Sequence, residues 1–287
     1  MVGYASLNNI EEITNCTVTS KSAQASILGN ATVGGIVGMF YDGGGLNKKY
    51  KPLTNCKVDA YIKGENNIGG LIGLISELYC YSLSIDNCSF DGTIDGISKI
   101  GGIIGNGNQK GLGYDSKLYL TSVKSKLNIS AKEGYAGGLI GIYTWINVYV
   151  LSSYSNVDFI NSSKYCGGLV GYIYSDYTEF NSSYSVVQFN EDVDKTTAGG
   201  FLGYFYDGKI TVTDSYTNYT TSGGSSNRGI YQAKNSYQDC SNNEIIEYMQ
   251  SSYSDYLSNW NLNNTYIWKG TVDGVSKSVV CPRLSWE

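Results

Sequence analysis

The sequence predicts an all-β fold, namely a right-handed parallel β-solenoid of about seven coils with a small C-terminal cap. Three observations predict it. A glycine motif repeats at a nearly constant interval, a Cys or Ser recurs between the glycine motifs, and Val, Ile, Thr and Tyr are abundant while helical periodicity is rare. The right-handed sense follows from the strong preference of parallel strand crossovers for that hand.

The glycine motif reads Gly-Gly-apolar-apolar-Gly and occurs six times, beginning at residues 34, 69, 101, 137, 167 and 199. We expect the apolar pair to fill the core and the paired glycines to allow a sharp corner or a close backbone approach. The predicted structural glycines are Gly34, Gly35, Gly69, Gly70, Gly101, Gly102, Gly137, Gly138, Gly167, Gly168, Gly199 and Gly200.

Between the glycine motifs, a small polar residue stands next to Cys or Ser. The pairs are Asn15-Cys16, Asn55-Cys56, Asn87-Cys88, Thr121-Ser122, Ser152-Ser153, Ser182-Ser183 and Asp214-Ser215. Each unit therefore carries about three short strand-like pieces, and like side chains would stack in columns when the coils pair in parallel. The Asp-Gly turn signals do not recur at one position of the unit, as propeller blades would require.

The repeat divides the chain into a solenoid over residues 1–240 and a capping segment over residues 241–287. The second part lacks the glycine motif and holds three of the four tryptophans, and residues 243–250 suggest a short helix. We expect this segment to cover the last coil, because a repeat array needs a cap on its open end. The stretch Val2-Gly3-Tyr4 matches Val170-Gly171-Tyr172, so we expect upstream solenoid coils of the same polypeptide as a partner.

Composition excludes several classes of function. The net charge is −5 and no Lys/Arg cluster occurs, which argues against nucleic-acid binding and against an anionic membrane surface. No segment approaches the ~20 apolar residues that cross a membrane, so no membrane insertion is expected. The absence of histidine excludes Cys/His zinc sites and histidine-based catalytic triads. We therefore expect no metal, no cofactor and no enzymatic activity.

The repeated unit resembles the GLUG-repeat family, whose unit reads roughly Asn-Cys-Tyr, a short strand and then Gly-Gly-Leu-Val-Gly. The resemblance covers about residues 1–240. It implies a repeat region of a large secreted or surface protein, either adhesin-like or flanking the catalytic part of an immunoglobulin-A-cleaving metalloprotease. It also implies an extracellular or cell-surface location. No protease chemistry carries over, because the chain has no histidine to hold a metal.

The end of the chain resembles the segment that closes such arrays. Asn235-Ser236-Tyr237 matches its opening, and Pro282-Arg283-Leu284-Ser285-Trp286 matches its aromatic ending. Residues 269–280 form a longer insertion than the resemblance implies.

Aromatic residues cluster after the glycine motifs and form a candidate binding ladder for sugar rings or a protein partner. The alternative is that these rings cover the core and turn their hydroxyls to water. The candidate residues are Phe40, Tyr41, Tyr143, Tyr172, Tyr174, Tyr204 and Tyr206.

Four of the cysteines stand at positions where other units carry Ser or Ala, which indicates small buried side chains. Cys240 and Cys281 lie outside these positions and form the candidate disulfide pair. Four carboxylates offer the best candidates for acid–base catalysis but do not share one position of the unit, so catalysis is not favoured. They are Asp176, Glu179, Asp207 and Asp214.

Three functions remain open. The first is a non-catalytic binding or adhesion module that contacts a protein or glycan on another surface, through the solenoid flank or through the variable loops near residues 42–51, 76–84 and 106–117. The second is a passive stalk that holds other domains off the cell surface. The third, and least favoured, is a polysaccharide-active β-helix enzyme.

Overall fold

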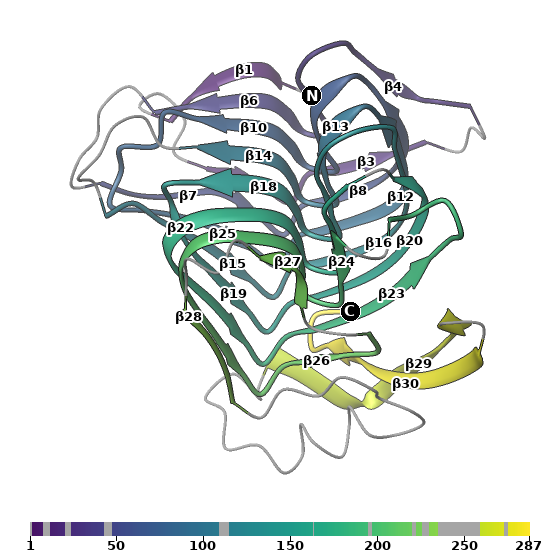
Figure 1. The fold of residues 1–287 in the computed structure, drawn as a ribbon. Helices are drawn as coiled ribbons and strands as arrows, with labels where there is room; N and C mark the ends of the chain where they lie inside the picture. Colours follow the sequence, from purple (N-terminus) through teal and green to yellow (C-terminus); the bar gives the residue numbers. More distant parts are fainter. Residues whose placement is uncertain are drawn as a thin grey trace.

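A computed structural model describes most of the chain, in eleven segments. These are residues 2–7, 12–20, 24–42, 48–108, 115–162, 164–194, 197–219, 222–225, 230–234, 259–272 and 275–287. The molecule is a right-handed parallel β-solenoid of about six turns with further partial turns, and no α-helix occurs in these segments. The fold class predicted from the repeat is confirmed (Figure 1).

Three parallel sheets run along the solenoid, and the largest, sheet A, bends into two arms (Figure 1). The first arm holds β1 (Val2–Ser6), β6 (Val37–Tyr41), β10 (Ile72–Ser76), β14 (Ile104–Asn108), β18 (Ile140–Thr144) and β27 (Ser222–Ser225). The second arm holds β2 (Ile13–Thr14), β7 (Lys49–Thr54), β11 (Ser82–Asp86), β15 (Lys117–Thr121), β19 (Asn147–Leu151) and β28 (Ile230–Lys234). Two strands run through both arms, β22 (Val170–Asn181) and β25 (Leu202–Thr213).

Two smaller sheets complete each turn. Sheet B holds β3 (Thr17–Thr19), β4 (Ile27–Leu28), β8 (Lys57–Lys63), β12 (Ser89–Gly96), β16 (Lys124–Ala131), β20 (Tyr154–Ser162), β23 (Tyr184–Phe189) and β26 (Tyr216–Thr217). Sheet C carries the start of the glycine motif and holds β5 (Val33–Gly34), β9 (Asn66–Gly69), β13 (Ser98–Gly101), β17 (Ala136–Gly137), β21 (Cys166–Gly167) and β24 (Ala198–Gly199).

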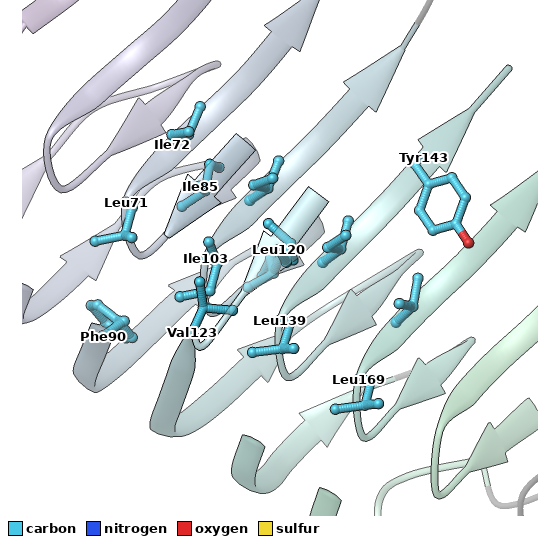
Figure 2. Close-up of a cluster of buried hydrophobic side chains, with 14 of the residues drawn as sticks. Leu71, Ile72, Ile85, Phe90, Ile103, Leu120, Val123, Leu139, Tyr143 and Leu169 are labelled. Atoms are coloured by element: carbon cyan, nitrogen blue, oxygen red, sulfur yellow. The ribbon is translucent and has the colours of Figure 1, made fainter. Parts of the chain in front are cut away.

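The core is built from columns of like apolar side chains on successive turns. Figure 2 shows Leu71, Ile103, Leu139 and Leu169, each from one copy of the glycine motif and each fully buried. Another column runs through the second arm and buries Leu53, Ile85, Leu120, Val150, Phe180 and Val212. Burial of these columns between neighbouring turns is the main stabilising contribution to such a fold.

The second glycine of each motif lies where sheet B approaches the corner between sheets C and A. A Cβ on Gly138 would lie 2.0 Å from the Gly168 carbonyl oxygen and 2.5 Å from Ser155 Oγ. In the same position, a Cβ on Gly70 would lie 2.3 Å from the Phe90 ring. The motif therefore needs glycine for close approach, which is one of the two reasons predicted from the sequence.

Each turn bends from sheet A into sheet B at one residue with a left-handed backbone. These residues include Asn55 and Asn87, with φ of 54° and 51°. Asn, Asp and Ser tolerate this conformation better than β-branched residues do, which explains the polar residue before each Cys or Ser. In the fourth unit the matching residue is Ser122, with φ of 53°. The sequence alignment of Thr121-Ser122 with Asn87-Cys88 was therefore wrong by one residue, and Val123 occupies the place of Cys88.

The C-terminal part forms an antiparallel hairpin of β29 (Trp260–Val272) and β30 (Val275–Leu284), followed by residues 285–287. We call residues 281–287 the strap. The described contacts of the hairpin and strap lie on the flank where sheet A turns into sheet B. Trp260 Nε1 donates to the Ser182 carbonyl at 3.1 Å, and Trp286 Nε1 donates to the Ser122 carbonyl at 3.0 Å.

The hairpin and strap thus run along the side of the solenoid across three successive turns, because Ser122, Ser152 and Ser182 occupy the same corner of those turns. They bond to Trp286, Asn259 and Trp260, respectively. We expected the C-terminal segment to cover the last coil, but its described contacts lie on the flank of the solenoid. The suggested helix at residues 243–250 lies outside the described residues, as does Cys240. Its disulfide with Cys281 stays a prediction, and Cys281 itself is fully buried.

Candidate functional site

Two columns of tyrosines meet where sheet C passes into the first arm of sheet A. Tyr172 and Tyr204 point outward from β22 and β25 and stack with ring centroids 5.6 Å apart. Tyr135 and Tyr165 stand just before β17 and β21 and stack at 5.4 Å. The columns interlock edge to face, with Tyr135 lying 4.8 Å from Tyr172 at an angle of 60°.

The glycine motif brings these columns together. A Cβ on Gly203 would lie 2.4 Å from the backbone carbonyl carbon of Tyr165. Because Gly203 has no side chain, the Tyr165 backbone lies directly against β25, and its ring reaches Tyr204 at 4.7 Å. The tyrosine cluster is therefore a consequence of the same close approach that shapes the corner.

A second group of rings continues the cluster along the first arm. Trp145 contacts Tyr174 at 4.2 Å, and Tyr174 contacts Tyr206 at 4.8 Å. Trp145 is 38% exposed and has a left-handed backbone with φ of 64°, at the corner between β18 and β19. We define the aromatic face as these seven side chains, namely Tyr135, Trp145, Tyr165, Tyr172, Tyr174, Tyr204 and Tyr206.

The aromatic face carries hydroxyls but no charge of its own at neutral pH. Burial raises the pKa of Tyr172 to about 12, and neighbouring tyrosines add to the effect. Burial also raises the pKa of Tyr135, with further contributions from Tyr165 and Tyr204. These phenols stay protonated, so each hydroxyl both donates and accepts hydrogen bonds.

Four of the seven residues predicted to form the binding ladder lie on the aromatic face. Tyr172, Tyr174, Tyr204 and Tyr206 belong to it. Tyr41 lies near the N-terminal end of the same arm, where it stacks with Tyr4 at 6.2 Å.

The prediction that Phe40 and Tyr143 belong to the surface ladder is wrong, because both side chains are fully buried in an inward column of the first arm. Tyr143 places its hydroxyl 2.5 Å from Thr178 Oγ1 inside the core.

Sequence reasoning missed Tyr135, Trp145 and Tyr165. A signal was present for two of them, since Tyr135 and Tyr165 each stand two residues before a glycine pair. It also missed a separate row on the second arm, where Tyr119 and Tyr149 stack at 4.6 Å. Alternation in the runs Leu-Tyr-Leu and Val-Tyr-Val would have placed that row on the surface.

The Cys and Ser residues between the glycine motifs form a hydrogen-bonded column. The Val123 N–H donates to Ser153 Oγ and the Ser153 N–H donates to Ser183 Oγ, both at 3.1 Å. The Cys56 N–H donates in the same way to Cys88 Sγ at 3.4 Å. These side chains are buried, as the sequence predicted, but they also satisfy a backbone group of the preceding turn.

Two of the four carboxylates considered for catalysis, Glu179 and Asp207, accept hydrogen bonds from groups near them in the sequence. Glu179 accepts hydrogen bonds from Tyr177 Oη and Asn181 Nδ2, both at 3.1 Å, and Asp207 accepts from the N–H of Gly208 at 2.9 Å. In the part of the chain that the structure describes, no group of three or more Cys, Asp or Glu side chains is arranged to hold a metal ion. The same segments contain no helix of the length and apolarity needed to cross a membrane.

Comparison of the chain with protein-family models, with curated proteins and with solved structures found no match.

Proposed function

We propose that the chain is a non-catalytic binding module of the adhesion type, displayed outside the cell as part of a larger surface polypeptide. The observation that carries the proposal is the aromatic face. Tyr and Trp are enriched at binding surfaces, because each combines a large apolar ring with a polar group. The fold does not require aromatic rings in the column of Tyr172 and Tyr204, because the equivalent positions on other turns hold Met39, Leu74, Asn106 and Ile142.

An uncharged, hydroxyl-bearing ligand suits this surface best. Stacking within each column covers much of the ring faces, so ring edges and phenol hydroxyls are presented to a ligand. Successive turns are about 4.8 Å apart, which repeats the hydroxyls along the solenoid axis. A neutral polysaccharide lying along that axis would meet a hydrogen-bonding group at each turn.

A glycan array with the purified chain tests the proposal. We expect binding to one or more neutral polysaccharides, lost in the Trp145→Ala and Tyr174→Ala variants. Tyr149→Ala is the matched control, because Tyr149 belongs to the separate row on the second arm. Equal glycan binding by all variants would contradict a role for the aromatic face. Binding of a host protein without any glycan binding would show that the ligand is a protein.

A passive spacer is the second candidate, and one observation favours it. Neighbouring rings of the aromatic face pack with centroids 4.2–5.6 Å apart, so they also stabilise the solenoid without any ligand. Under this alternative, Tyr174→Ala lowers the melting temperature, and neither the glycan array nor a host-protein screen detects a ligand.

The GLUG-like repeat supports an extracellular or cell-surface location for this module. The recurring Gly-Gly motif and the Asn-Cys pairs carry that resemblance. Surface immunolabelling of intact cells tests the location, and labelling only after permeabilisation would contradict it.

A further inference from the structure

A small polar pocket lies on sheet B where the strap passes over it. Its volume is about 230 Å³, below the roughly 300–1,000 Å³ of sites for drug-sized ligands. One sugar unit is a ligand of suitable size. The lining residues are Phe90, Asp91, Lys124, Lys126, Tyr154, Asn156 and Arg283.

The strand register aligns three of the polar side chains. Asp91 pairs with Lys126, and Lys126 pairs with Asn156, so they occupy one column on successive turns. Their neighbours Phe90, Ser125 and Ser155 are buried, which places this column on the outer surface of sheet B. With a spacing of about 4.8 Å, the three groups span a distance similar to that of one sugar ring with its substituents.

The carboxylate of Glu287 does not line the pocket, but it bonds three of the side chains that do. Glu287 Oε2 lies 2.6 Å from Lys124 Nζ and 3.2 Å from the Arg283 guanidinium, and Tyr154 Oη donates to Oε1 at 3.0 Å. The Glu287 side chain is only 3% exposed. This wall of the pocket is therefore built to bind carboxylate, and its two cations are partly neutralised.

Lys126 is the remaining cation. It is exposed and makes no ion pair within the described part of the chain. Asp91 stands beside Lys126 on the neighbouring turn. Partial burial raises the pKa of the Asp91 carboxyl, whereas the nearby charges of Lys126 and Lys124 lower it. Asp91 and Asn156 are the acceptor and the donor–acceptor that commonly hold sugar hydroxyls.

We propose that this pocket binds one acidic sugar unit of the uronate type. The sugar carboxylate pairs with Lys126 and Arg283, and the sugar hydroxyls bond to Asp91 and Asn156. This site is separate from the aromatic face and does not rest on its function. A column of carboxylate, ammonium and amide suits a ligand with both hydroxyls and a negative charge better than a simple anion, which Asp91 would repel.

Calorimetric titration of the full chain with glucuronate, glucose and acetate tests the proposal. We expect glucuronate to bind at least tenfold more tightly than either of the other two. Lys126→Gln should weaken glucuronate binding about tenfold, because it removes a charge-assisted hydrogen bond. Lys132→Gln is the matched control, since Lys132 is an exposed lysine outside the pocket.

Three further results separate the outcomes. Trp145→Ala should leave glucuronate binding unchanged, so that failure of the aromatic face and failure of this pocket are distinguishable. Acetate binding as tight as glucuronate binding would overturn the sugar assignment. Unchanged binding in Lys126→Gln, with an unchanged melting curve, would overturn the pocket itself.

Discussion

Ser183 accepts a hydrogen bond at Oγ from the backbone N–H of Ser153, one turn earlier, at 3.1 Å. The single hydrogen of the same hydroxyl is shared between two carbonyl acceptors, Asn181 at 3.0 Å and Val150 at 3.1 Å. One fully buried hydroxyl thus joins two turns where sheet A bends into sheet B.

Ser183→Ala should lower the free energy of unfolding by about 1–3 kcal/mol, because it leaves the Ser153 N–H buried without a partner. Ser183→Cys should cost less than Ser183→Ala, since Cys88 accepts the equivalent bond from Cys56. Urea denaturation of the three proteins measures the difference. Equal losses for Ala and Cys would show that the column needs only a small side chain.

Gly138→Val should destabilise the chain by about 3 kcal/mol or prevent folding. The new Cβ would meet the Gly168 carbonyl oxygen at 2.0 Å, and backbone cannot move there without shifting the next turn. Gly107→Ala is the control, because its Cβ would meet only side-chain carbons at 3.6 Å or more. Thermal melts of both variants make the comparison, and an unchanged Gly138→Val melt would contradict the close-approach explanation.

Trp260→Ala should cost about 3–5 kcal/mol, the usual range for removing a buried Trp. Trp260 is 6% exposed, lies 5.4 Å from the Tyr184 ring and donates to the Ser182 carbonyl. Trp145→Ala is the matched control on the aromatic face and should cost under 1 kcal/mol, because Trp145 is 38% exposed. If both variants melt alike, the hairpin does not stabilise the solenoid flank.

The chain should lose stability as the pH rises from about 10 to 12. Burial raises the pKa of Tyr172 from 10.0 to about 12 in the folded state, so folding favours the protonated phenol. This stabilisation is complete below pH 10, the ordinary tyrosine value, and disappears as the pH passes 12. Tyr172→Phe should reduce the pH dependence of the melting temperature between pH 9 and 12. An identical profile for the wild type and Tyr172→Phe would exclude a contribution from Tyr172.

The sequence by itself determined the repeat, the parallel coil and the need for glycine at each corner. These follow from local chemistry repeated at one period: a residue without Cβ at Gly138 and its equivalents, a residue that tolerates a left-handed backbone before each Cys or Ser, and β-branched residues between them. Any fold that satisfies all units at once must stack them.

Only the tertiary structure decided which side chains share a surface. Tyr41 and Phe40 are adjacent in the sequence, yet one is outward and the other buried, because alternation depends on where the corner ends and the strand begins.

The pocket on sheet B was equally beyond sequence reasoning. Lys124 and Glu287 are 163 positions apart and meet only because the strap folds back along the flank. No local pattern in the sequence indicates that return, because Trp260 and Trp286 contact Ser182 and Ser122 on turns that lie two apart.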